Sequence, residues 1–165
     1  MKENENQLKV AFSASKLADR RSEPSVFEHS LEFVARINQV NYINDSKATS
    51  VNDTWNSLSV MTEPTVLIIG GNDRRSDFSV LRGLVGEKVK AIVCLGSERE
   101  KVFSALMSKS MVVHANDLEE AVKISSLLAR PGQTVLFSPG CPSFDAFDNY
   151  KNRGNKFKEL VSILS

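Results

Sequence analysis

Short apolar runs of strand length alternate with helical patterns along most of this chain. The runs are rich in Val and Ile, and they are TVLII (65–69), VKAIVCL (89–95), MVVH (111–114) and TVLFS (134–138). Helical stretches follow them near 78–85, at 97–108, at 117–129 and up to about residue 163. Short, continuously apolar strands separated by helices are typical of a parallel sheet covered on both faces. The pattern therefore predicts an α/β fold, a Rossmann-like, doubly wound, mostly parallel sheet with helices on both faces.

The N-terminal part has a different pattern. Residues 7–20 have the spacing of an amphipathic helix, and the polar, Pro-containing stretch 21–30 is typical of a linker. The segments LEFVARI (31–37) and VNYIN (40–44) flank Asn38-Gln39, which predicts a β-hairpin or a tight strand pair. We therefore expect an N-terminal helix and a strand pair ahead of the parallel strands.

Composition narrows the function classes. A chain of 165 residues suits one α/β domain with a short appendage, and a formal net charge of +1 gives no reason to expect a nucleic acid or an anionic membrane as partner. The polar N-terminus lacks the apolar core of a signal peptide, so we expect a cytoplasmic protein. In that compartment a disulfide between Cys94 and Cys141 is not expected, and two Cys with two scattered His do not make a zinc site.

Three polar loops leave the carboxyl ends of the predicted strands. They read NDSKATS (44–50), GGNDRRSD (70–77) and SPGCPSFD (138–145). In doubly wound sheets, ligands bind in the crevice beyond these strand ends. The coincidence of the three loops at one edge is the main functional signal that the residues themselves carry.

The first loop contains two charged residues that the start of a helix does not require. Ser50 with Asp53 three residues on fits a capping box, which accounts for both residues structurally. Asp45 and Lys47 are left without such a role. An acid and an ammonium at a strand end suit a nucleotide, with the carboxylate on a ribose hydroxyl or Mg²⁺-bound water and the ammonium on phosphate. On spacing alone, the structural and the nucleotide interpretations are equally open.

The second loop begins with Gly70-Gly71 after a buried strand, where a ligand can approach the backbone closely. The chain contains neither a G-x-G-x-x-G fingerprint nor a P-loop. Asp77 or Ser76 is expected to cap the helix that follows. Arg74 is either a solvated cation or a guanidinium suited to bidentate capture of a carboxylate.

The third loop places Ser143 where the last parallel strand gives way to a helix. A serine there is an expected N-cap, and helix N-terminal amides with a hydroxyl also suit an anion such as a carboxylate. Cys141 has no histidine near it in sequence, so we do not expect a catalytic thiol.

Taken together, YINDSKAT, IIGGNDRRSDF and LFSPGCPSFDAFDNYKNRGNKFKELV resemble the C-terminal domain of the Mur ligases, from about His29 to Val161. The N-D-S-K-A-T element is most similar to the branch of the family that adds D-glutamate. The resemblance implies an enzyme of peptidoglycan synthesis that uses ATP and Mg²⁺ to convert a carboxylate to an acyl phosphate, which the amine of D-glutamate attacks. It implies that Asp45 and Lys47 face the nucleotide. It also implies that the D-glutamate carboxylates are held by Thr49, Arg74 and Ser143 and by the backbone around Phe144 and Tyr150.

The chain departs from the family pattern at several places. Arg74 stands where a lysine is usual, and Ser30 stands where the family carries an arginine in the ATP site. Gly140 and Pro142 replace two alanines, and Ser50 replaces an asparagine. The loss of a cation at position 30 should weaken nucleotide binding unless another residue replaces it.

The resemblance also predicts a division of the chain. Residues 1–27 are expected to be the tail of a central domain with a linker, and residues 28–165 the amino-acid-binding domain. Without a P-loop we expect no ligation by this chain alone, a UDP-sugar substrate bound through other domains, and a monomer. Three alternatives stay open: a sister ligase with another acceptor, a stand-alone module that binds an amino acid or nucleotide without chemistry, and a generic dinucleotide binder that lacks the glycine fingerprint.

Overall fold

The structure is a computed structural model that describes residues 28–70, 75–143 and 146–164. The helix expected at 7–20 lies outside these residues. Along the chain the elements are β1 (Glu32–Ile37), β2 (Val40–Asn44), α3 (Val51–Ser59), β3 (Thr65–Gly70), the short 3₁₀ helix η1 (Phe78–Leu81), α4 (Arg82–Lys88), β4 (Val89–Leu95), α5 (Arg99–Leu106), β5 (Met111–His114), α6 (Leu118–Leu128), β6 (Thr134–Phe137) and α7 (Tyr150–Ile163).

In the described part of the chain, six strands form one sheet in the order β1-β2-β6-β3-β4-β5. The strands from β2 to β5 in this order run parallel to their neighbours, and β1 pairs antiparallel with β2. Asn38 and Gln39, which join β1 to β2, have φ angles of 50° and 64°. Two successive left-handed residues make the type I′ turn that suits a two-residue hairpin. The predicted mostly parallel sheet and the N-terminal strand pair are both confirmed.

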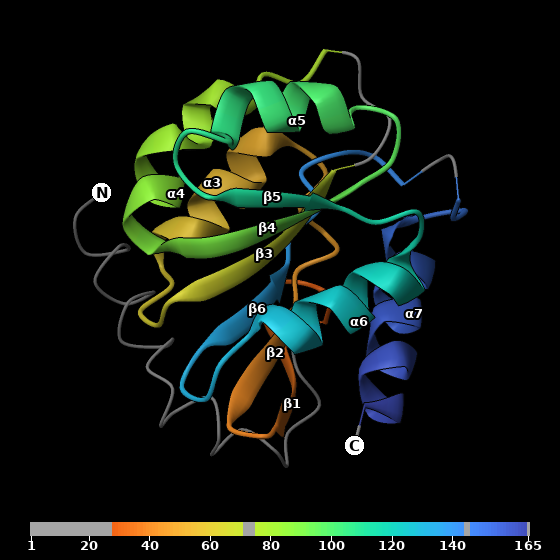
Figure 1. The fold of residues 1–165 in the computed structure, drawn as a ribbon. Helices are drawn as coiled ribbons and strands as arrows, with labels where there is room; N and C mark the ends of the chain where they lie inside the picture. Colours follow the sequence, from red (N-terminus) through yellow and green to blue (C-terminus); the bar gives the residue numbers. More distant parts are fainter. Residues whose placement is uncertain (1–27, 71–74, 144–145, 165) are drawn as a thin grey trace, which may run out of the picture.

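Helices cover both faces of the sheet, with α3, α4 and α5 on one side and α6 and α7 on the other (Figure 1). In β3, the four residues Val66 to Ile69 are all apolar because both faces of the strand are buried. Leu67 and Ile69 pack into the core beneath α3–α5, while Val66 and Ile68 pack into the core beneath α6 and α7. A central parallel strand has no solvent face, so no polar alternation remains to be seen in its sequence.

One predicted helix start is confirmed, at Phe78 after the cap Asp77, and one is wrong. The stretch near 78–85 is η1 followed by α4, with Asp77 accepting a hydrogen bond from the Ser79 amide at 3.0 Å. The last helix does not begin at Ser143 but at Tyr150, after the N-cap Asn149. Packing explains this difference, because the apolar stripe that covers the sheet lies late in α7, at Phe157, Leu160 and Val161.

Both cysteines are buried, and no disulfide joins them in the part of the chain that the structure describes. Burial raises the pKa of the Cys94 thiol to about 12, which leaves it unreactive. Among the described helices, none combines the length and the apolar character required to cross a bilayer.

Candidate functional site

Two of the three polar loops touch at the carboxyl edge of the sheet. We call them the β2 loop (residues 45–50) and the β6 loop (residues 138–143). The Gly140 amide donates to the carbonyl of Ala48 at 3.0 Å, and the Gly70 amide, at the end of β3, donates to the carbonyl of Pro139 at 2.9 Å. β6 lies between β2 and β3 in the sheet, so its loop leaves the sheet between the ends of these two strands. The expected convergence at this edge is therefore observed for the residues that the structure describes.

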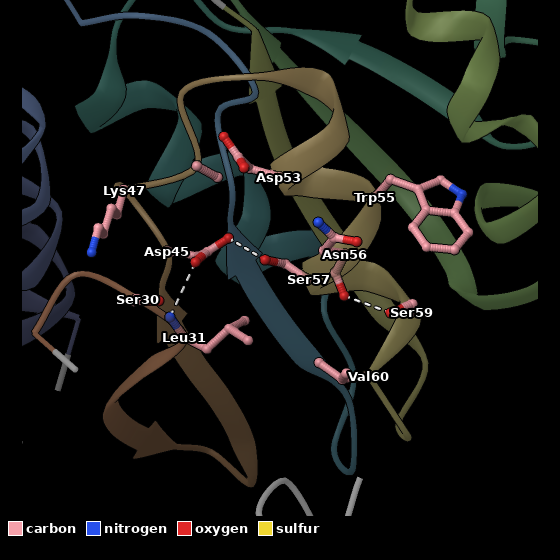
Figure 2. Close-up of a pocket in the computed structure, with 11 residues that line it drawn as sticks. Ser30, Leu31, Asp45, Lys47, Asp53, Trp55, Asn56, Ser57, Ser59 and Val60 are labelled. Atoms are coloured by element: carbon pink, nitrogen blue, oxygen red, sulfur yellow. Dashed lines mark hydrogen bonds between the residues drawn. The ribbon is translucent and has the colours of Figure 1, made fainter. Parts of the chain in front are cut away.

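A cavity of about 660 Å³ opens beside the β2 loop and α3 (Figure 2). Asp45 and Lys47 both contribute to it, as do polar side chains of α3. Figure 2 shows Asp45 and Ser57 pointing toward each other from the loop and the helix, with Lys47 on the side of the cavity away from Trp55. The lining consists of Ser30, Leu31, Asp45, Lys47, Ala48, Asp53, Trp55, Asn56, Ser57, Ser59 and Val60.

Asp45 is almost completely buried, at 3% exposure, and its two oxygens have different surroundings. Oδ2 accepts hydrogen bonds from the hydroxyls of Ser57 at 2.6 Å and Ser138 at 2.7 Å. Within the described residues, Oδ1 accepts only the amide of Leu31, at 3.1 Å. Burial raises the pKa of the Asp45 carboxyl to about 6, although these hydrogen bonds lower it. Asp45 therefore has a structural role that sequence spacing did not indicate, and Oδ1 retains capacity for one more donor.

Lys47 behaves differently from its neighbour. Its backbone amide donates to the carbonyl of His29 at 2.9 Å, while its side chain is exposed. No hydrogen bond or ion pair of its ammonium is found within the described residues. The loop thus fixes the backbone of Lys47 and leaves the cation available for an anion in the cavity.

The backbone at the cavity edge adopts unusual torsions. His29 and Leu31 have φ angles of 64° and 47°, on either side of Ser30. Non-glycine residues in this region cost free energy and need support from their surroundings. Two observed contacts supply it here, since His29 Nδ1 bonds the amide group of Asn44 and the Leu31 amide bonds Asp45.

The other predicted site residues are distributed as follows. Thr49 is half-buried in the β2 loop, Ser143 is 7% exposed at the end of the β6 loop, and Tyr150 begins α7. Ser143 borders a smaller cavity of about 190 Å³, which Gly70 and Cys141 also line. The carbonyl of Tyr150 accepts a hydrogen bond from the Ser46 hydroxyl at 2.8 Å, so α7 starts against the β2 loop. Arg74 and Phe144 lie outside the described residues.

Sequence reasoning missed the residues that hold Asp45. Ser138 follows directly after β6, at the same sheet edge as Asp45 after β2, so the strand-end rule pointed to it. Ser57 had no such signal, because it lies on α3 at no motif spacing from Asp45. By contrast, the predicted capping box at the start of α3 is confirmed in both directions, between Ser50 and Asp53.

A mostly parallel sheet with helices on both faces defines a Rossmann-like α/β domain, and its polar loops and cavity lie at the carboxyl edge, where sheets of this kind bind ligands. The family model described as "Mur ligase, glutamate ligase domain" matches residues 31–141, and the chain belongs to this family. The resemblance seen in the sequence is therefore confirmed.

Individual relatives share one printed name, which is narrower than the description of the family model. The chain is 46% identical over 166 residues to the UDP-N-acetylmuramoylalanine–D-glutamate ligase of Chloroherpeton thalassium, covering 96% of this chain and 36% of that protein. It is 49% identical over 138 residues to the protein of the same name from Christiangramia forsetii, covering 83% and 31%. The chain spans about a third of the length of these relatives.

A solved structure agrees in fold. The MurF ligase from Thermotoga maritima in complex with ADP superposes with a TM-score of 0.56 at 13% identity, covering 90% of this chain and 34% of that one. At this level of identity the likeness shows the shared fold.

Proposed function

We propose that this chain is the amino-acid-binding and nucleotide-closing domain of an ATP-dependent ligase that adds D-glutamate to UDP-N-acetylmuramoyl-L-alanine in peptidoglycan synthesis. The observation that carries the proposal is the cavity in which Asp45 and Lys47 meet, directly beside the β6 loop that bears Ser143. Relatives at 46% and 49% identity that are named as D-glutamate ligases support D-glutamate as the acceptor.

On the nucleotide side, Asp45 and Lys47 have separate roles in this proposal. Asp45 Oδ1 accepts a ribose hydroxyl, because it has one protein donor where Oδ2 has two. Lys47 binds phosphate through its exposed ammonium. The buried carboxylate is held rigidly by its hydrogen bonds, so it offers a preorganised acceptor and loses little side-chain entropy on binding.

Mg²⁺ would accompany the nucleotide. Among the described residues there is no group of three or more His, Cys, Asp or Glu side chains placed to hold a metal ion. We therefore propose that the ion is held by phosphate oxygens of ATP and by groups outside the described residues. When bound, it neutralises phosphate charge during acyl phosphate formation.

On the acceptor side, Ser143 and Thr49 hold the D-glutamate carboxylates together with Arg74 and with backbone groups around Phe144 and Tyr150. Ser143 is supported by its position beside the smaller cavity and by its burial. The roles of Arg74 and Phe144 rest on the family resemblance. The function of this side is positioning, because holding the amine near the acyl phosphate removes much of the entropic cost of the reaction.

The remaining parts of the reaction involve residues beyond those described. In this proposal the UDP-sugar and most of the ATP site belong to other domains, and the enzyme is a cytoplasmic monomer. Residues 1–27 are the tail of a central domain with a linker to residues 28–165. The 165-residue chain by itself is expected to show no ligation.

A second candidate is a stand-alone module that binds an amino acid or a nucleotide without chemistry. The observation in its favour is Ser30, which lines the large cavity where the family carries an arginine. A ligase requires a cation from elsewhere to compensate, whereas a binding module does not.

The proposal is tested by an NMR titration of the ¹⁵N-labelled chain with D-glutamate, using L-glutamate and L-lysine as controls. We expect saturable shifts at Thr49 and Ser143 with D-glutamate only, and a dissociation constant near millimolar, which corresponds to about 4 kcal/mol. Ser143→Ala should weaken this binding, while Ser126→Ala, on the exposed face of α6, should not. Equal responses to both enantiomers, or no saturable response, would overturn D-glutamate as the ligand.

A further inference from the structure

Arg153, in the second turn of α7, is a buried cation without an acidic partner among the described residues. Its exposure is 5%, and it takes part in none of the ion pairs found in the described ranges. Burial lowers the pKa of its guanidinium, but arginine remains charged under all physiological conditions. Burying a charge is costly, so its neutral contacts must compensate.

Those contacts lie on two different loops. Nε donates to the Ser46 hydroxyl at 3.0 Å, and Nη2 donates to the Ser46 carbonyl at 2.8 Å. Nη1 donates to the carbonyl of Cys141 at 3.0 Å. Ser46 stands between Asp45 and Lys47 in the β2 loop, and Cys141 lies two residues before Ser143 in the β6 loop. One planar group thus joins the two halves of the site.

The groups that Arg153 binds are themselves fully engaged. The Ser46 amide donates to Asn44 Oδ1 at 3.1 Å, and its hydroxyl donates to the Tyr150 carbonyl at 2.8 Å. The thiol of Cys141 donates to the carbonyl of Gly70, at the end of β3, at 3.1 Å. The guanidinium therefore sits in a network that extends from β2 through α7 to β3.

We propose that Arg153 is a positioning residue. By bonding both loops, it fixes the position of Lys47 in the β2 loop relative to Ser143 in the β6 loop, and so couples the nucleotide side of the site to the acceptor side. The ligands of the two sides rest on the proposed function, but the mechanical link between the loops does not. A purely structural role would not require arginine, because well-packed apolar residues in place of a buried ionic group are often neutral or stabilising. The five donors of a rigid fork, however, can bond two separate loops at once.

The test is hydrogen exchange of the backbone amides in the unliganded chain and in Arg153→Met. We expect the amides of Lys47 and Gly140, one in each loop, to exchange at least tenfold faster in the variant, while amides of β3 and β4 keep their rates. Arg82→Met is the matched control, because Arg82 is exposed and donates to one backbone carbonyl, that of Ala105. It should leave both loops unchanged.

Three results with Arg153→Met would overturn the proposal: unchanged protection in both loops, a loss confined to one loop, or an equal loss throughout the sheet. Arg153→Lys separates charge from geometry. It keeps the cation but not the fork, so we expect it to leave at least one loop deprotected, and full restoration of both would refute the link. D-glutamate titration distinguishes the two hypotheses, because a wild-type chain without D-glutamate-specific shifts contradicts the proposed function while the exchange result still decides the role of Arg153.

Discussion

The β2 loop and the β6 loop meet at one sheet edge but are stabilised in different ways. The β2 loop combines local and distant contacts. Locally, the Ala48 amide bonds the Asp45 carbonyl, and Ser50 forms a reciprocal cap with Asp53. From far along the chain, Ser138 bonds Asp45, and Arg153 bonds Ser46. The β6 loop is held by distant residues, with Gly140 bonded to Ala48 and Cys141 bonded to Arg153.

The nucleotide side, on the β2 loop, and the acceptor side, on the β6 loop, therefore depend on different parts of the molecule. The nucleotide side is formed partly by local structure, including the capped start of α3, whereas the acceptor side depends on where α7 and the β2 loop place it. Changes outside the β6 loop should therefore disturb the acceptor side, and changes in the β2 loop should act mainly on stability and on the nucleotide. The following variants test this difference, from the largest expected effect to the smallest.

Gly154→Ala should disrupt both regions. A methyl group at this position would overlap His29 Nδ1 and would lie 3.0 Å from Asn44 Nδ2, so α7 must shift away from β2. We expect a loss of about 3 kcal/mol in the free energy of unfolding, at the upper end for overpacking. Chemical denaturation measures it. Gly83→Ala is the control, since no atom lies within 4 Å of the added methyl, and it should stabilise α4 by about 0.5–1 kcal/mol. Equal effects of the two variants would contradict the packing described here.

Asp45→Asn should change the pH dependence of stability. The folded-state pKa of Asp45, about 6, is above the ordinary value of an aspartate, so the folded chain binds an extra proton between roughly pH 4 and 6. The contribution of this carboxyl to stability is then full below about pH 4 and is lost as the pH rises through 6. Relative to wild type, the variant should gain roughly 1–3 kcal/mol between pH 4 and pH 7.

Asp77→Asn is the control for that experiment. The Ser79 hydroxyl and amide lower the pKa of Asp77, so its contribution is present at neutral pH and is lost as the pH falls. In denaturation series from pH 3 to pH 7, Asp77→Asn should therefore depart from wild type only near and below pH 4, with a slope opposite to the one that Asp45→Asn shows between pH 4 and pH 7. Slopes of the same sign would show that Asp45 does not titrate as its burial indicates.

Lys88→Met should loosen the far end of α3, which supports the nucleotide side. The Lys88 ammonium donates to the carbonyls of Leu58, Ser59 and Met61 at 3.2, 2.8 and 2.9 Å, at the C-terminal end of the helix. Cations there are favourable, and hydrogen bonds to charged groups are the stronger ones, so we expect a loss of about 2 kcal/mol. Lys109→Met, at an exposed position, should change the thermal midpoint little. A similar drop of the thermal midpoint in Lys88→Met and Lys109→Met would contradict a specific stabilising role of Lys88.

The two helix caps should give the smallest effects. Ser50→Ala removes the cap of α3, and Asn149→Ala removes the bond that Asn149 Oδ1 accepts from the Asn152 amide at 2.9 Å. Each should cost about 1 kcal/mol in urea denaturation. Because Ser50 belongs to the β2 loop, only Ser50→Ala should also speed amide exchange at Asp53. An equal exchange response at Asp53 to both variants would argue against local stabilisation of this loop.

Much of the fold was accessible from the sequence because its determinants are local or periodic. The four parallel-strand runs, the hairpin turn at Asn38-Gln39 and the capping box at Ser50 each depend on residues a few positions apart. The pairing of Asp45 and Lys47 at one cavity followed from the strand-end rule together with the family resemblance.

Other features depend on contacts that no local pattern encodes. The start of α7 was misplaced because Ser143 and Asn149 are both good caps, and tertiary packing of the later apolar stripe decides between them. The burial of Asp45 depends on Ser138, which is 93 residues away, and the burial of Arg153 depends on Ser46, which is 107 residues away. Arg153 and Gly154 lie in the last stretch that carries the family resemblance, and no local pattern marks them. The structure gives each a separate physical role, Arg153 as a donor to two loops and Gly154 as a close contact with His29.

The most direct test of the nucleotide side is a titration of the ¹⁵N-labelled chain with Mg²⁺-ADP. We predict saturable shifts at Asp45, Lys47 and Ser57, affinity at least tenfold weaker in Lys47→Met (about 1.4 kcal/mol), and no change in Lys90→Met, whose lysine is exposed on β4. Binding that Lys47→Met leaves intact, or shifts confined to residues away from the cavity, would contradict the assignment of this edge of the sheet to a nucleotide.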